Sequence, residues 1–194
     1  MPLFPSSLAQ GIFDAVYLVW VVVFFLERVI VSRSGQGTAK TRSDRGSAFL
    51  IWASVFVSIS VAYAFAYEGL GILPDWVFYV GISLMVLGIF VREWAVVTLG
   101  GYFSYRVRVR EDHRVVDNGP YGVIRHPAYT GSILTVVGLG LALRTSAGAV
   151  ALVLFCALAY GYRIHVEENA LLKELGNEYS KYMQRTKRLI PWVI

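Results

Sequence analysis

The stretch GPYGVIRHPAYTG at residues 119–131 concentrates rigid and ionisable residues in an otherwise apolar chain. Pro120 and Pro127 fix their own φ angles and hold the preceding residues extended, and Pro127 stands where a helix can begin. A helix N-terminus offers free N–H groups and a positive dipole end, which suit a carboxylate. The two tyrosines and the Arg125–His126 pair add flat rings and donors. This combination predicts a ligand site, with an interfacial turn of aromatic anchors and basic residues as the alternative.

A second candidate lies in YRIHVEEN at residues 162–169. Arg163 and Glu167 are four residues apart, so they share one face of a helix. A guanidinium can hold a carboxylate in two-pronged geometry, and a glutamate can orient it or act as a base. The same spacing also fits a plain helix-stabilising ion pair worth about 0.2–0.5 kcal/mol. The residues alone leave both readings open.

Other residues that could do chemistry are less promising. His113, His126 and His165 form no close-spaced pair, so we expect no metal site. The single cysteine, Cys156, excludes an intrachain disulfide and a cysteine metal cluster. The stretch SGQGTAK at 34–40 lacks the last glycine of a phosphate loop and is interpreted as a flexible basic loop.

The composition predicts a membrane protein. The 194 residues suffice for one domain; 56% are hydrophobic and 16% charged, against roughly 25% charged in soluble domains. The first charge is Asp14, so the first apolar run lacks the basic start of a signal peptide and is expected to be retained. The net charge of +5 is placed in loops between apolar runs, which favours a membrane topology signal over nucleic-acid binding.

The apolar runs predict an all-α, polytopic protein with about five transmembrane helices. The runs cover residues 11–30, 48–67, 76–99, 128–143 and 147–162. The first three approach the ~20 residues that a crossing needs. The last two are shorter and are predicted to be two crossings, with a hairpin that only dips into the bilayer as the alternative. Basic residues then place the N-terminus outside and the candidate site and C-terminus in the cytosol.

Two further features bear on this topology. Arg92 and Glu93 interrupt the third run, and either face the bundle interior or snorkel to the headgroups. The polar segment 166–185 is predicted to be a cytosolic helix that packs on the loops or lies on the membrane surface. Its apolar face is formed by Leu172, Leu175, Tyr179 and Tyr182.

Taken together, two stretches resemble the isoprenylcysteine carboxyl methyltransferase family. They are DHRVVDNGPYGVIRHPAYTG and YRIHVEENALLKELGNEYSKYMQRTKRLIP, within residues 100–191. The resemblance divides the chain into N-terminal transmembrane helices 1–3 (1–99) and a methyltransferase catalytic region (100–194). That region would comprise the cofactor-binding loop, two helices and the cytosolic C-terminal helix.

The resemblance implies S-adenosylmethionine as methyl donor and a prenylcysteine carboxylate, or a similar lipophilic acceptor from the bilayer, as substrate. Arg163 and Glu167 match the family's catalytic and acceptor-binding pair. The implied cofactor residues are His113, Arg114, Val115, Val116, Tyr121, His126, Pro127, Ala128 and Tyr129. The run RIHVEEN is less acidic than is usual in the family, so a phospholipid amine remains an alternative acceptor. A sterol-reductase-like enzyme using NADPH and a non-enzymatic membrane bundle are the rival classes.

Overall fold

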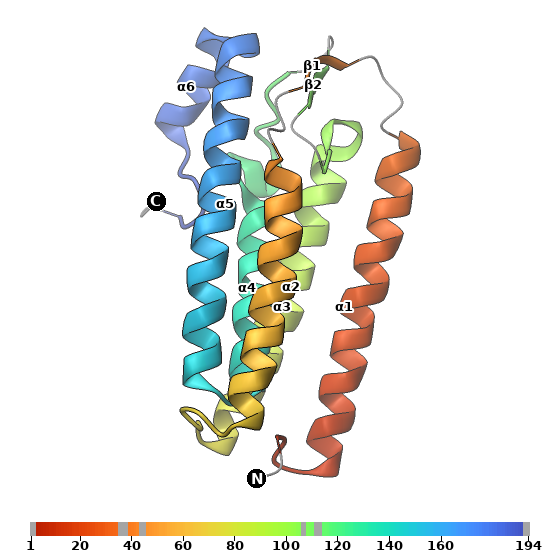
Figure 1. Cartoon of the computed structure of the whole chain (residues 1–194). Coiled ribbons are helices and arrows are strands. Elements are labelled where there is room, and N and C mark those ends of the chain that lie inside the picture. The colour runs from red at the N-terminus through yellow and green to blue at the C-terminus, as the bar shows by residue number, and fades with distance from the viewer. Residues whose placement is uncertain (1–2, 35–38, 43–45, 106–107, 111–113, 192–194) are drawn as a thin grey trace.

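The computed structural model describes residues 3–34, 39–42, 46–105, 108–110 and 114–191. Its helices are α1 (Ser7–Ser34), α2 (Ser47–Tyr67), α3 (Asp75–Leu99), α4 (Pro127–Ala142), α5 (Ser146–Leu175) and α6 (Asn177–Arg185). Two short 3-10 helices, η1 (Gly100–Tyr102) and η2 (Gly119–Gly122), lie in the loop before α4. Strands β1 (Ala39–Arg42) and β2 (Arg108–Arg110) pair antiparallel and join two loops at one end of the bundle (Figure 1).

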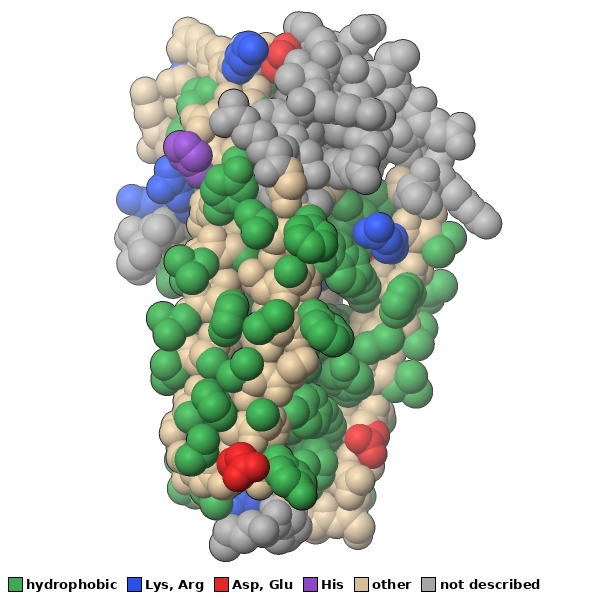
Figure 2. All heavy atoms as spheres, viewed as in Figure 1, with side chains coloured by type: hydrophobic (Ala, Val, Ile, Leu, Met, Phe, Trp, Pro, Cys, Tyr) green, Lys and Arg blue, Asp and Glu red, His purple; other side chains and the backbone are tan. Residues whose placement is uncertain are grey.

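Helices α1 to α5 run side by side in alternating directions and form a multi-pass membrane bundle (Figure 1). The predicted all-α class is confirmed, apart from the short β1–β2 ladder. Among the described residues, α1, α2, α3 and α5 are long and apolar enough to cross a membrane, whereas α4 is a shorter apolar helix. Apolar side chains cover the outer face of α1 and α2 (Figure 2), as expected for a surface in contact with lipid.

Although α4 has only 16 residues, it extends to the far end of the bundle. The turn after it meets the turn between α2 and α3: the Thr145 hydroxyl donates to the Leu70 carbonyl at 2.8 Å, and the Leu73 N–H donates to the Arg144 carbonyl at 2.8 Å. Helix α4 therefore reaches as deep as its neighbours, which favours the predicted two crossings over a hairpin that dips into the bilayer.

Glycines let α3 and α4 approach closely. A Cβ on Gly81 would lie 2.3 Å from the Ala142 backbone nitrogen, and one on Gly88 would lie 2.5 Å from the Gly131 carbonyl oxygen. Helices in lipid associate through such backbone contacts, because lipid tails offer no hydrophobic driving force between helices. The contact sets the position of α4, whose first residues belong to the candidate site.

We expect Gly88→Ala to destabilise the protein and Gly11→Ala to stabilise it. The new methyl group at position 88 collides with backbone atoms of α4, and overpacking of this kind costs roughly 1–3 kcal/mol. Position 11 of α1 has open space around it, so alanine there gains up to about 1 kcal/mol of helix propensity. Thermal unfolding in detergent measures both variants. Shifts of equal size and sign would contradict close α3–α4 packing.

The charge inside the third apolar run faces the bundle interior. Arg92 donates to both carboxylate oxygens of Glu27 on α1, at 3.0 and 2.7 Å, and to the Ser132 hydroxyl at 2.7 Å. Its side chain is 11% exposed. Arg92 therefore does not snorkel, because a buried carboxylate compensates its charge. Glu93 lies beside the same Glu27 carboxylate and remains partly exposed.

The boundaries predicted for a helix over residues 166–185 are wrong. Helix α5 continues to Leu175, and Gly176 separates it from α6 with φ of 53°, a left-handed value that glycine readily adopts. The predicted packing on the loops is confirmed, because Tyr179 and Tyr182 are buried and the Tyr182 hydroxyl donates to the Tyr121 carbonyl at 2.8 Å.

Candidate functional site

A polar cavity lies at the end of the bundle that carries α6. Of the nine predicted cofactor residues, seven line it: Arg114, Val115, Val116, Tyr121, His126, Ala128 and Tyr129. Pro127 is fully buried as the first residue of α4 and fixes the turn rather than the cavity wall. His113 lies outside the described residues. Arg163 and Glu167 line the same cavity, so the predicted cofactor and acceptor residues are brought together.

The GPYG turn and the start of α4 shape one wall of the cavity. Gly119 has φ of 54°, which reverses the chain before η2 and places Tyr121 inside, where it is 7% exposed. Burial raises the pKa of Tyr121 and raises that of Tyr182 to about 12. Both phenols therefore stay protonated at neutral pH, so the Tyr182 hydroxyl remains a donor to the Tyr121 carbonyl.

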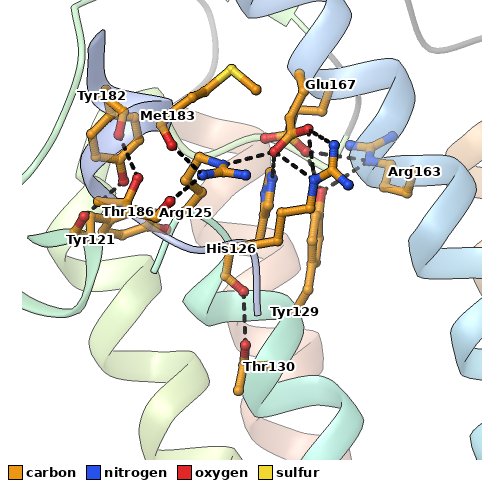
Figure 3. Close-up of polar contacts among 12 residues, drawn as sticks. Tyr121, Arg125, His126, Tyr129, Thr130, Arg163, Glu167, Tyr182, Met183 and Thr186 are labelled. Carbon is orange, nitrogen blue, oxygen red and sulfur yellow. Dashed lines mark hydrogen bonds and ion pairs between the residues drawn. The ribbon is translucent and has the colours of Figure 1, made fainter. Parts of the chain in front are cut away.

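Tyr129 connects the two residues that were predicted to be catalytic (Figure 3). Its hydroxyl donates to Glu167 Oε2 at 2.5 Å and accepts from Arg163 Nε at 3.0 Å. The direct distance from Arg163 Nε to Glu167 Oε2 is 3.8 Å, so the predicted ion pair is bridged by the phenol. The Tyr129 ring also stacks on His126, with centroids 5.4 Å apart and planes at 13°.

Glu168 is a buried acid that the sequence analysis missed. Its carboxylate accepts from Arg125 Nε at 2.8 Å and Arg188 Nη2 at 2.9 Å, and lies 3.4 Å from His126 Nε2. The side chain is 4% exposed. Glu168 follows Ile164 by four residues, and a glutamate in line with a buried apolar residue is the signal that could have revealed it.

The C-terminal tail after α6 holds the back of the His126 turn. The Arg125 and His126 N–H groups donate to the carbonyls of Lys187 and Arg188, at 2.7 and 3.0 Å. The Thr130 hydroxyl donates to the Leu189 carbonyl at 2.8 Å. The tail and Glu168 together fix the turn from both sides, which keeps the His126 and Tyr129 rings in place.

A second cavity, the apolar groove, opens between α1 and α2. It measures about 410 Å³. Its lining includes Tyr17, Trp20, Val21, Phe24 and Phe25 from α1, and Ile51, Trp52, Val55, Phe56 and Ile59 from α2. Four residues line both the groove and the polar cavity: Phe103, Ser104, Tyr129 and Arg163.

Arg163 occupies the junction of the two cavities. It is 2% exposed and is held by the Tyr129 hydroxyl and by the Tyr105 carbonyl, which accepts from Nη2 at 3.0 Å. A buried guanidinium between a polar and an apolar cavity can fix an anionic group on a lipophilic ligand. Within the described part of the chain, no group of three His, Cys, Asp or Glu residues could hold a metal ion.

Fold and site thus define a class: multi-pass integral membrane proteins with a polar cavity that meets a lipid-facing groove at one arginine. A model of the isoprenylcysteine carboxyl methyltransferase (ICMT) family matches residues 80–173, which include α4, Arg163 and Glu167. Over these residues the chain is similar to this family.

Individual proteins are similar to the chain over a comparable stretch. Protein-S-isoprenylcysteine O-methyltransferase B of Arabidopsis thaliana is 31% identical over 120 residues, 61% of each chain. A solved structure of the eukaryotic intramembrane Ras methyltransferase ICMT is similar with a TM-score of 0.58 and 26% identity, over 76% of this chain and 51% of that one. A cobalt-zinc-cadmium resistance protein of Cupriavidus metallidurans is 31% identical over 57% of this chain and 46% of its own. The chain spans about three fifths of the length of the Arabidopsis relative.

Proposed function

We propose that the protein transfers a methyl group from S-adenosylmethionine to the carboxylate of a C-terminal isoprenylcysteine or a similar lipophilic acceptor. One observation carries the proposal: Arg163 and Tyr129 line both the polar cavity and the apolar groove. A water-soluble donor and a bilayer-borne acceptor could therefore meet at these two side chains. The Arabidopsis relative is named as a protein-S-isoprenylcysteine O-methyltransferase.

The polar cavity has the chemistry to hold the proposed donor. Tyr121 and Tyr129 offer aromatic faces, which suit an adenine ring and attract a sulfonium cation. Arg114 and Glu167 offer opposite charges for the carboxylate and amine of an amino acid. The enclosed space of about 90 Å³ is smaller than the roughly 300–1,000 Å³ typical of ligand sites, so we expect the cavity to widen on binding.

Arg163 is the proposed clamp for the acceptor carboxylate. A guanidinium can grip both oxygens, and the Tyr129 hydroxyl links Arg163 to Glu167, which keeps the clamp oriented. When bound, S-adenosylmethionine supplies a sulfonium-linked methyl group that a carboxylate oxygen can displace without loss of a proton. Orientation by Arg163 and exclusion of water by the groove then supply most of the acceleration. Glu167 serves as positioning residue in this reaction, and would become a candidate base for an amine acceptor.

The groove would admit the lipid part of the acceptor laterally, between α1 and α2. The polar cavity would admit the donor from the side of the bundle that carries α6. The proposal includes the orientation predicted from the basic residues, with the N-terminus outside and the site in the cytosol. It also gives residues 100–194 the catalytic role and residues 1–99 the lipid-facing role, with Arg92 lining the groove.

The donor site is tested by calorimetry with S-adenosylhomocysteine on the detergent-solubilised protein. We expect S-adenosylhomocysteine to bind and NADPH not to bind. Tyr129→Ala and His126→Ala should each weaken binding at least several-fold, since a lost stack or charge-assisted bond costs about 1–3 kcal/mol. Tyr79→Ala is the matched control, because Tyr79 is 55% exposed on α3 away from both cavities. Unchanged affinity in both cavity variants would indicate that residues 119–131 form an interfacial turn and not a ligand site.

A further inference from the structure

The apolar groove has a closed floor. At its deep end Tyr17 and Trp20 of α1 pack edge to face, with centroids 5.6 Å apart. Below them Phe13 stacks on Tyr17 at 5.9 Å and is 2% exposed within the bundle core. The groove therefore ends at the Tyr17–Trp20 pair, which we call the floor.

The top of the groove is equally well defined. Arg92 and Glu27 join α3 to α1 through their buried ion pair, and Arg163 marks the junction with the polar cavity. Helix α1 is thus fastened to the bundle above and below the groove, and between these points the Phe24 ring of α1 meets the Trp52 ring of α2 edge to face, with centroids 4.9 Å apart. At the sides, Phe25 and Phe56 are 59% and 74% exposed, so the groove opens towards lipid between α1 and α2 (Figure 2).

The groove has a similar length along three helices. Its lining residues lie within nine residues of α1 (17 to 25) and nine of α2 (51 to 59), which are eight rises of 1.5 Å or about 12 Å on each helix. On α4 they extend from Tyr129 to Val136, or about 10 Å. An extended chain advances about 1.2 Å per bond, since a residue with three backbone bonds spans about 3.5 Å. The groove therefore holds about ten chain bonds.

We propose that the floor formed by Tyr17 and Trp20 sets the length of the acceptor's hydrocarbon chain, with a preference for ten to fifteen carbons over twenty. A prenyl chain advances four bonds per isoprene unit. Chains of ten, fifteen and twenty carbons, counted from the sulfur, therefore span about 10, 14 and 19 Å. The last exceeds the groove by more than one helical turn of 5.4 Å. The inference rests on the proposed function, because it assumes that Arg163 fixes the other end of the acceptor.

The discrimination is expected to be several-fold rather than absolute. A chain end that does not fit leaves through the open side of the groove and remains in hydrocarbon, so it loses no hydrophobic stabilisation. What it loses is close packing against the groove walls, and it must bend to leave. The preference therefore falls on kcat/KM for the acceptor and not on donor affinity.

The test compares S-prenyl N-acetylcysteines of ten, fifteen and twenty carbons in a methyl-transfer assay with purified protein in vesicles. We expect kcat/KM for twenty carbons to be roughly fivefold or more below that for fifteen. Tyr17→Ala deepens the groove by about one turn, or one isoprene unit, and should bring the two values together. Val21→Phe fills the middle of the groove and should shift the preference towards ten carbons. Tyr79→Ala is the control and should keep the wild-type profile.

A second measurement does not depend on methyl transfer. A fifteen-carbon acceptor with a terminal diazirine should, on irradiation, label the α1 peptide that contains Tyr17 and Trp20. Labelling confined to Phe25, Trp52 or Phe56 at the open side would overturn the inference, as would one chain-length profile shared by wild type, Tyr17→Ala and Val21→Phe. Methyl transfer to none of the three acceptors would instead overturn the proposed function itself.

Discussion

Arg163→Lys is expected to lower the rate of methyl transfer by roughly 10²–10³-fold, the range seen when one preorganised donor is removed from an active site. Lysine keeps the positive charge but cannot reproduce a two-pronged grip, and it cannot contact the Tyr129 hydroxyl and the Tyr105 carbonyl in the same geometry. The loss should appear in kcat and in the acceptor KM. Affinity for S-adenosylhomocysteine should change much less, because the aromatic wall of the polar cavity stays in place.

Arg185→Lys is the matched control for this prediction. Arg185 pairs with Asp117 on the surface, with side chains 60% and 50% exposed, and exposed pairs contribute at most about 1 kcal/mol. It should leave activity and stability nearly unchanged. Thermal unfolding of both variants distinguishes a loss of acceptor binding at Arg163 from a loss of protein stability. Near-normal turnover in Arg163→Lys would show that Arg163 does not act in the catalytic centre.

Glu168→Gln should destabilise the protein by roughly 3–5 kcal/mol, the cost of removing one partner from a buried ion pair. The substitution keeps the side-chain shape, but it leaves the buried guanidinium of Arg125 without its carboxylate. His126 loses its partner at the same time, so binding of S-adenosylhomocysteine should weaken as well. Thermal unfolding and calorimetry on the same sample measure the two effects.

Two comparisons sharpen this result. Glu68→Gln replaces an exposed glutamate after the end of α2 and should have no measurable effect. Arg188→Ala should cost less than Glu168→Gln, because Arg188 is 49% exposed and Arg125 still compensates the Glu168 charge. Equal stabilities for Glu168→Gln and Glu68→Gln would contradict a structural role for the buried cluster.

The sequence by itself determined the membrane class and the elements of the bundle. Runs of about 20 apolar residues have few alternatives in hydrocarbon, where each backbone group must be paired within its own helix. Tyr121, His126 and Tyr129 were also predictable, because they are local: two prolines and the helix that begins at Pro127 dictate the turn. The cavity residues at 114–116 were implied only by the family resemblance. The boundary between α5 and α6 was predicted incorrectly, since the apolar spacing continues past Gly176 and conceals the break.

Only the tertiary structure decided which distant residues meet. Glu27 is one charge on a lipid-facing helix until α1 packs beside α3 and brings it to Arg92, 65 residues away. Glu168 acquires its role from a turn 42 residues before it and a tail 20 residues after it. The spacing of Arg163 and Glu167 put them on one face, but the hydroxyl that joins them comes from another helix. Such contacts depend on how helices pack, and helix packing is set by shape complementarity across the bundle rather than by the periodicity of one segment.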